Sequence, residues 1–116
     1  MKVAIQGELG SNSHMAALAM LGQDADNSPQ DLGIVACATS PEVFEQIAAG
    51  SVDGAVLPIE NSLHGSVAEH YDLMLAQPVR IARESLLRVR HNLIGVPGAT
   101  LADIRRAMSH PVALSQ

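Results

Sequence analysis

Three short apolar stretches, each followed by a turn and a helix start, constrain the fold of this chain more than any other feature. They are Lys2–Gln6, Gly33–Ala38 and Asp53–Ile59. Strands that are apolar along their whole length are typical of parallel sheets covered on both faces, whereas half-exposed strands alternate apolar and polar residues. The sequence therefore predicts an α/β fold in which helices sandwich a parallel sheet.

Helix signals lie between and after these stretches. The segment His14–Leu21 is almost wholly apolar and is followed by Gly22, so we expect a helix that packs on more than one side. Ser40-Pro41-Glu42 places a cap, a proline and an acid at the start of a second helix that ends at Gly50. A third helix is expected over 67–76, because apolar residues recur there at helical spacing.

The pattern changes after Pro78. Between Leu87 and Leu93 apolar residues alternate with polar ones, which predicts a strand with one wetter face. Thr100 to Asp103 resembles a capping box and predicts a helix to about Met108. We therefore expect a first subdomain over residues 1–79 and a crossover with an incomplete second subdomain over residues 80–116.

The end of the sequence follows closely on a new helix start. Ser109-His110-Pro111 stops the preceding helix and could cap another, and Gln116 lies within about two turns of it. A turn that has buried nothing does not offset its ordering entropy, so the chain is expected to be cut short. Residues 24–31 are expected to form a polar surface loop.

Composition excludes several classes of function. The chain carries a formal charge of −5 with one Phe, one Tyr and no Trp, which disfavours a nucleic-acid partner that needs basic or stacking residues. The single Cys37 lies in an apolar stretch and is interpreted as a buried thiol rather than a reactive one. Without a signal-like start or a long apolar span, we expect a cytoplasmic protein with no membrane partner.

Small polar residues gather where the predicted strands end and helices begin. In open parallel sheets such junctions meet in one crevice, and uncharged donors there suit a small, oxygen-rich anion. Capping alone is the competing interpretation for any one junction. Glu60 after an apolar strand is not required by a turn, although a structural salt bridge or cap would also explain it. The five histidines lack the spacing of a metal site, so no metal is expected.

Several segments together resemble the prephenate dehydratases. They are Val3-Ala4-Ile5-Gln6-Gly7-Glu8-Leu9-Gly10-Ser11-Asn12-Ser13, Val52-Asp53-Gly54-Ala55-Val56-Leu57-Pro58-Ile59-Glu60-Asn61-Ser62-Leu63-His64-Gly65-Ser66-Val67, His91-Asn92-Leu93-Ile94 and Ser109-His110-Pro111-Val112-Ala113-Leu114-Ser115-Gln116. The match spans the whole chain. The segment Pro-Ile-Glu-Asn-Ser with a later Ser-His-Pro-x-Ala-Leu-x-Gln is far more specific than any single glycine pattern.

The resemblance implies a catalytic domain of two α/β subdomains, similar to type II periplasmic binding proteins, with prephenate bound between them. It implies a lyase that converts prephenate to phenylpyruvate, water and CO2 in phenylalanine biosynthesis, with no metal or organic cofactor. Because aromatisation drives the reaction, such an enzyme mainly holds two carboxylates and helps the ring hydroxyl leave. Arogenate dehydratase and a non-catalytic small-anion binding module with the same cleft are the alternatives.

The resemblance also assigns site residues. Catalytic roles fall on Glu60, Asn61, Ser109 and Gln116, with Glu60 orienting its neighbours or polarising the leaving group. Substrate-binding roles fall on Ser62, Ser11, Ser13 and His64. The glycine loop departs from the family pattern Gly-Pro-x-Gly-Thr-Phe-Thr, since it reads Gly7-Glu8-Leu9-Gly10-Ser11-Asn12-Ser13.

The family's Thr-Arg-Phe motif, with its candidate proton donor, does not occur among the 116 residues, and neither does a regulatory ACT domain. These residues by themselves are therefore expected to have little or no dehydratase activity. An exposed strand near Leu87 to Leu93 would invite pairing with another copy, so we expect a homodimer or a higher homo-oligomer.

Overall fold

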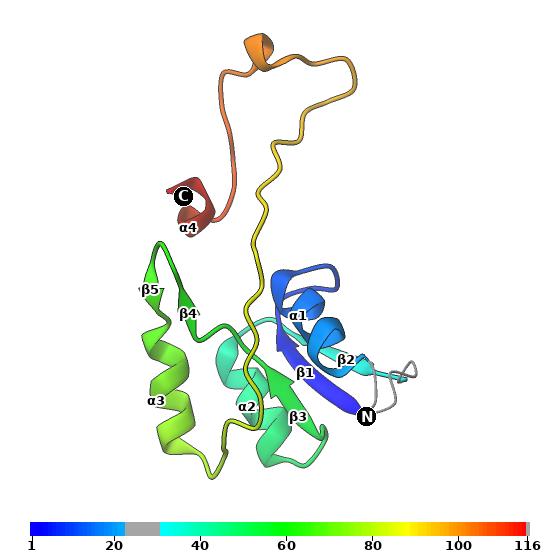
Figure 1. Ribbon diagram of the computed structural model, residues 1–116, viewed down its shortest axis with the longest axis vertical. Helices are drawn as coiled ribbons and strands as arrows, with labels where there is room; N and C mark the ends of the chain where they lie inside the picture. Colours follow the sequence, from blue (N-terminus) through cyan, green and yellow to red (C-terminus); the bar gives the residue numbers. More distant parts are fainter. Residues whose placement is uncertain (23–30, 116) are drawn as a thin grey trace.

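A computed structural model describes residues 1–22 and 31–115 (Figure 1). Its main sheet has the order β2-β1-β3, with β1 (Lys2–Gln6) between β2 (Gly33–Cys37) and β3 (Gly54–Val56). Both pairings are parallel, as Lys2 aligns with Gly33 in one and Val3 with Gly54 in the other. The predicted α/β fold with a parallel sheet is confirmed, and most of the predicted loop at 24–31 lies outside the described residues.

Helices cover the two faces of this sheet. Alternate residues of a strand point to opposite faces, so Val3 and Ile5 pack with Ala17 of α1 (Asn12–Leu21). Ala4 faces the other way and belongs to a second buried cluster with Val43 of α2 (Ser40–Ala48). The core therefore lies on both sides of β1, which explains why the first strand is apolar along its length.

The helix ends show where the sequence signals were accurate and where they were not. Ser11 caps α1, accepting a hydrogen bond from the His14 backbone N–H at 3.3 Å, and Gly22 follows the helix as predicted. The cap of α2 is Thr39 rather than Ser40, because Thr39 has the extended backbone and accepts from the Glu42 N–H at 3.4 Å. Ser40 is instead buried inside the first turn.

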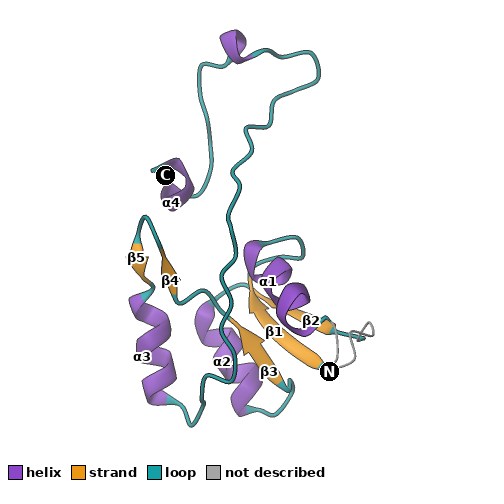
Figure 2. Ribbon diagram, viewed as in Figure 1, coloured by secondary structure: helices purple, strands orange, loops and turns teal. Residues whose placement is uncertain are grey.

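The third apolar stretch forms a shorter strand than predicted. β3 ends at Val56, and Pro58 follows, which has no N–H to donate to a ladder. The chain then forms a small antiparallel hairpin of β4 (Glu60–Asn61) and β5 (Gly65–Ser66), where a loop was expected. The predicted third helix is confirmed as α3 (Ala68–Ala76), which packs on α2 (Figure 2).

Residues 77–110 leave the sheet and run as an extended excursion (Figure 1). The predicted strand near Leu87 to Leu93 is wrong for the described residues, because no neighbouring strand pairs with it there. The predicted helix to Met108 is also wrong and shrinks to the 3-10 turn η1 (Leu101–Asp103). A short helix with no apolar face buried does not propagate.

The last element is the single turn α4 (Pro111–Leu114). His110 caps it, since its Nδ1 atom accepts a hydrogen bond from the Val112 N–H at 3.2 Å. The expectation that Ser109-His110-Pro111 could start a helix is thus confirmed, with His110 as the capping residue. The excursion from α3 brings α4 back beside the β4–β5 hairpin (Figure 1).

Candidate functional site

The β4–β5 hairpin holds Asn61 in a defined orientation. Its Oδ1 atom accepts hydrogen bonds from the backbone N–H groups of Leu63 at 2.9 Å and His64 at 3.2 Å. This is an Asx turn, which a short polar side chain makes with its own backbone two residues on. Because the oxygen is occupied in this way, the amide NH2 of Asn61 is the group left to donate to a ligand.

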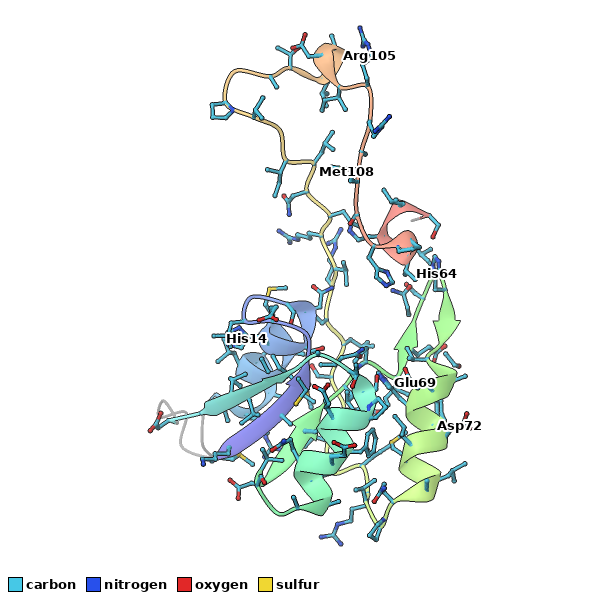
Figure 3. All side chains as sticks on the ribbon, turned by 180° about the vertical axis from the view of Figure 1, so that it is seen from behind. His14, His64, Glu69, Asp72, Arg105 and Met108 are labelled. Atoms are coloured by element: carbon cyan, nitrogen blue, oxygen red, sulfur yellow. The ribbon has the colours of Figure 1, made fainter. Side chains whose placement is uncertain are left out.

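The hairpin is tied to α4 by one side-chain contact. His64 lies at the far end of the hairpin (Figure 3), and its Nε2 atom is 2.8 Å from the Ser115 hydroxyl. The same hydroxyl lies 3.0 Å and 3.1 Å from the carbonyl oxygens of Val112 and Pro111, to which it can donate. When the hydroxyl donates to the helix backbone, it accepts from the Nε2–H of His64.

A pocket of about 240 Å³ opens between these elements. Four separate segments supply its walls: the start of α1, the β4–β5 hairpin, the extended excursion, and α4 with its cap. The lining residues are Asn12, Asn61, Val89, His91, His110, Val112 and Ala113. All four segments include residues of the motifs that carried the family resemblance.

Two polar residues of this pocket, Asn61 and His110, each have a hydrogen-bond donor left for a ligand. The Nδ1 atom of His110 already accepts from the backbone, so the neutral ring carries its proton on Nε2 and can donate there. Asn61 donates through its amide, as described above. Such a set suits a carboxylate or hydroxyl oxygen more than a cation. Among residues 1–22 and 31–115, no group of three or more His, Cys, Asp or Glu side chains could hold a metal ion.

The structure brings only some of the predicted site residues to this pocket. Asn61 lines it. Glu60 is exposed and precedes Asn61 on the same strand, so its side chain points to the opposite face. Ser62 and His64 are exposed at the hairpin turn, while Ser11 and Ser13 flank the lining residue Asn12. Ser109 lines a separate hollow beside the excursion, and Gln116 lies outside the described residues.

Three polar lining residues were not predicted as site residues: Asn12, His91 and His110. Each lies inside a segment that the family resemblance already quoted. A signal was present for two of them, because Asn12 and His110 are polar residues at predicted helix starts, whereas His91 lies inside the predicted strand from Leu87 to Leu93. The sequence interpretation favoured the hydroxyl groups on either side of Asn12, and it treated His110 as part of a helix stop.

Two groups with shifted pKa values, Cys37 and Asp103, lie away from the pocket. Burial, and secondarily the negative charge of Glu42, raise the pKa of the Cys37 thiol. The Asp103 carboxylate accepts hydrogen bonds from the Thr100 hydroxyl at 2.7 Å and from the Thr100 backbone N–H at 2.9 Å. These bonds, the hydroxyl's first in size, lower the pKa of the Asp103 carboxyl. No helix within the described part of the chain is long and apolar enough to cross a membrane.

Comparisons with known proteins agree with the motifs. The sequence profile of the prephenate dehydratase family matches residues 3–116. An arogenate dehydratase/prephenate dehydratase of Arabidopsis thaliana is 40% identical over 115 residues, 99% of this chain and 28% of its own length. A prephenate dehydratase of Mycobacterium leprae is 35% identical over 118 residues, 99% of this chain and 37% of its own length.

A solved structure is similar as well. The X-ray structure of prephenate dehydratase from Streptococcus mutans superposes with a TM-score of 0.54 at 30% identity, covering 66% of this chain and 37% of that chain. This chain thus spans roughly a quarter to two fifths of the length of these relatives. With a profile match over nearly every residue and a matching fold, the chain belongs to the prephenate dehydratase family.

Proposed function

We propose that the residues around the pocket, with Asn61 and His110 among them, form one side of a cleft that binds prephenate. We also propose that the protein is a lyase that forms phenylpyruvate, water and CO2. The observation that carries this proposal is the meeting of four motif segments at one donor-rich pocket. Segments that lie far apart in the sequence have no structural need to place Asn12, Asn61, His91 and His110 around the same space.

The chemistry asks for what these groups can supply. In prephenate the bond from the ring to its carboxylate breaks, CO2 leaves, and the electron pair becomes a ring double bond. The C–O bond to the ring hydroxyl breaks at the same time, and that oxygen needs a proton to leave as water. Neutral donors such as the Asn61 amide and the His110 Nε2–H can bind a substrate carboxylate or the departing oxygen.

The remaining site residues keep their proposed roles. Ser109 and Gln116 would bind substrate from the second subdomain, and Ser11, Ser13, Ser62 and His64 would border the cleft. Of the two roles expected for Glu60, orienting its neighbours fits a side chain that points away from the pocket, whereas polarising the leaving group would require it to face the substrate. Residues 1–79 would form the first subdomain and 80–116 the crossover and the start of the second.

The direct test measures phenylpyruvate formation by the protein expressed from its complete open reading frame. Asn61→Ala should lower kcat/KM by about a hundredfold or more, the usual effect of removing one donor to a developing charge. Gln46→Ala is the matched control, because it removes an amide from α2, whose residues do not line the pocket. A folded wild-type protein that binds prephenate without turnover would instead indicate a non-catalytic binding module.

Arogenate is the second candidate substrate. Relatives with arogenate in their names are among the most similar proteins, including an arogenate dehydratase of Petunia hybrida at 38% identity over all of this chain. Arogenate carries an amine where prephenate carries a keto group, and both share the carboxylates and the ring hydroxyl that the donors of Asn61 and His110 can bind. Competition between the two substrates for the same preparation would settle which has the larger kcat/KM.

Assembly and location complete the proposal. Exposed apolar side chains along the excursion, such as Ile81, Leu93 and Val96, favour a homodimer or a higher homo-oligomer, which sedimentation would reveal. We place the protein in the cytoplasm, to be tested by cell fractionation. Location is not carried over from the family, since the Arabidopsis relative is described as chloroplastic.

A further inference from the structure

His70 is a buried histidine that the proposed mechanism does not use. It lies on α3 with 1% of its surface exposed, and both of its ring nitrogens are hydrogen-bonded. Nδ1 is 2.6 Å from the carbonyl oxygen of Pro58, and Nε2 is 2.7 Å from the hydroxyl of Ser40. The ring therefore links α3 to α2 and to the segment between β3 and the hairpin.

The partners determine where the ring protons lie. A carbonyl oxygen can only accept, so Nδ1 must carry a proton and donate to Pro58. In the neutral ring Nε2 then accepts from the Ser40 hydroxyl. In the charged ring Nε2 donates to Ser40, whose hydroxyl can in turn donate to the Glu69 carboxylate at 3.2 Å. The bond to Pro58 is present in both states.

This arrangement does not fit nucleophilic catalysis. Ser40 is 1% exposed, so a substrate cannot reach its hydroxyl. The carboxylate of Glu69, on α3 (Figure 3), lies against Ser40 and not against the second ring nitrogen, where a triad would need it. A structural or positioning role remains.

The bond to Pro58 reaches the pocket through a short piece of backbone. Pro58 cannot donate to a ladder, and β3 ends before it, so the main sheet does not fix this stretch. Leu57 packs against the buried cluster that contains Ala4 and Val43. After it, the backbone carbonyls accept two hydrogen bonds, one at Pro58 from the His70 ring and one at Ile59 from the Val67 N–H at 2.9 Å. Immediately afterwards the chain enters β4, which carries Asn61 into the pocket.

We propose that His70 is a positioning residue for the pocket: through its Nδ1–H on the Pro58 carbonyl it sets the backbone that delivers Asn61. This inference deepens the proposed function and rests on it for its catalytic consequence. A displacement of the Asn61 amide by a fraction of an ångström weakens its contact with the ligand, because hydrogen bonds depend steeply on distance and angle.

Two substitutions separate the two nitrogens of the ring. His70→Asn keeps an N–H donor attached to Cγ, where Nδ1 is attached, and so retains the bond to Pro58. His70→Gln places its amide nitrogen one bond further out, where Nε2 lies, and so retains the bond to Ser40 while losing Pro58. Ser40→Ala removes the Nε2 contact alone. Each of the three changes removes about one hydrogen bond, and the two His70 variants also remove part of a buried ring. A purely structural role therefore predicts comparable losses of stability from His70→Asn and His70→Gln, and a smaller loss from Ser40→Ala.

A positioning role predicts a different pattern at the site. Both His70 substitutions remove the ring current of the imidazole, so the two variants are compared with each other. In the 116-residue chain, the backbone amide NMR shifts of residues 59–61 should move further from their wild-type positions in His70→Gln than in His70→Asn, and they should stay in place in Ser40→Ala. In the protein from the complete open reading frame, kcat/KM should remain within about twofold for His70→Asn and Ser40→Ala. It should fall roughly tenfold to a hundredfold for His70→Gln.

The inference is overturned if His70→Asn and His70→Gln change the 59–61 shifts equally. It is also overturned if ¹⁵N shifts of the wild-type ring find the proton of neutral His70 on Nε2 alone, a measurement that needs no folded variant. A wild-type protein that is inactive on prephenate and arogenate would refute the proposed function. The NMR comparison would still decide the role of His70.

Discussion

Replacement of Ile5 tests whether the central strand holds the fold. Ile5 is fully buried on β1 and packs with Ala17 and Val56 between the sheet and α1. Ile5→Ala removes the Cγ1, Cγ2 and Cδ1 carbons, and at about 0.8 kcal/mol each their transfer to water alone accounts for about 2.4 kcal/mol. The cavity left behind adds to this, so the total loss of unfolding free energy should be about 3 to 5 kcal/mol.

The same substitution at an exposed position is the control. Ile94 lies in the excursion and is 88% exposed, so Ile94→Ala in the 116-residue chain should change the unfolding free energy by less than about 0.5 kcal/mol. Urea unfolding followed by circular dichroism measures both changes. Ile5→Val, expected to cost about 0.5 to 1.5 kcal/mol, supplies a milder step if Ile5→Ala leaves no folded baseline.

The reasoning is refuted if Ile5→Ala costs no more than Ile94→Ala. The control has a second use in the protein from the complete open reading frame. If residues 80–116 pack into a second subdomain, as proposed, Ile94 is covered there and Ile94→Ala should cost more than about 1 kcal/mol. An unchanged value in the protein from the complete open reading frame would contradict the proposed subdomain division.

Other substitutions probe the helix ends and the buried thiol. Gly50→Ala should lower the unfolding free energy by about 1 kcal/mol, because Gly50 has φ +64 and a side chain is strained there. Gly54→Ala is the control, since a Cβ at Gly54 also meets open space but its φ is not positive, and it should change the unfolding free energy little. Thermal unfolding compares the two variants. Thr39→Ala should lose about 1 kcal/mol with the α2 cap and Thr39→Ser much less, as denaturant unfolding will show. Since the folded state raises the pKa of Cys37, its contribution to stability is complete below the ordinary thiol range and is lost as the pH rises through the raised value. The pH dependence of unfolding above neutrality should therefore weaken in Cys37→Ala, and an unchanged slope would contradict this cause.

The elements that the sequence predicted well are those that bury their own apolar face inside the described chain. β1 is apolar because helices cover it on both sides, and α1 follows from an apolar run between Ser11 and Gly22. Such signals depend on neighbours only a few dozen residues away. They therefore predicted the parallel sheet and its three main helices from local sequence pattern.

The wrong predictions share a physical cause. Alternation between Leu87 and Leu93 is a strand signal, but a strand exists only when a neighbour accepts its hydrogen bonds, and the described residues offer none. The capping box at Thr100 formed, as the bonds to Asp103 show, yet the helix after it did not. A local signal can start an element, whereas tertiary packing decides whether it continues.

The candidate site shows the same division. The motifs identified the segments that meet, but they did not say which residue of each segment faces the pocket. Strand alternation places Asn61 inside and Glu60 outside, and the helix start places Asn12 at the wall between Ser11 and Ser13. Those orientations depend on backbone geometry that residue identity alone does not specify.

The donor character of the pocket is a consequence of its own local structure. The oxygen of Asn61 is occupied by the hairpin backbone, and the Nδ1 atom of His110 by the first turn of α4. Both side chains contain one donor group and one acceptor group. In each, the backbone of the turn occupies the acceptor, so the donor is left for a ligand. A chain with a net charge of −5 can in this way bind an anionic, oxygen-rich ligand through neutral groups. If the pocket binds prephenate as proposed, the same turns that shape the hairpin and α4 also select the chemistry of its ligand.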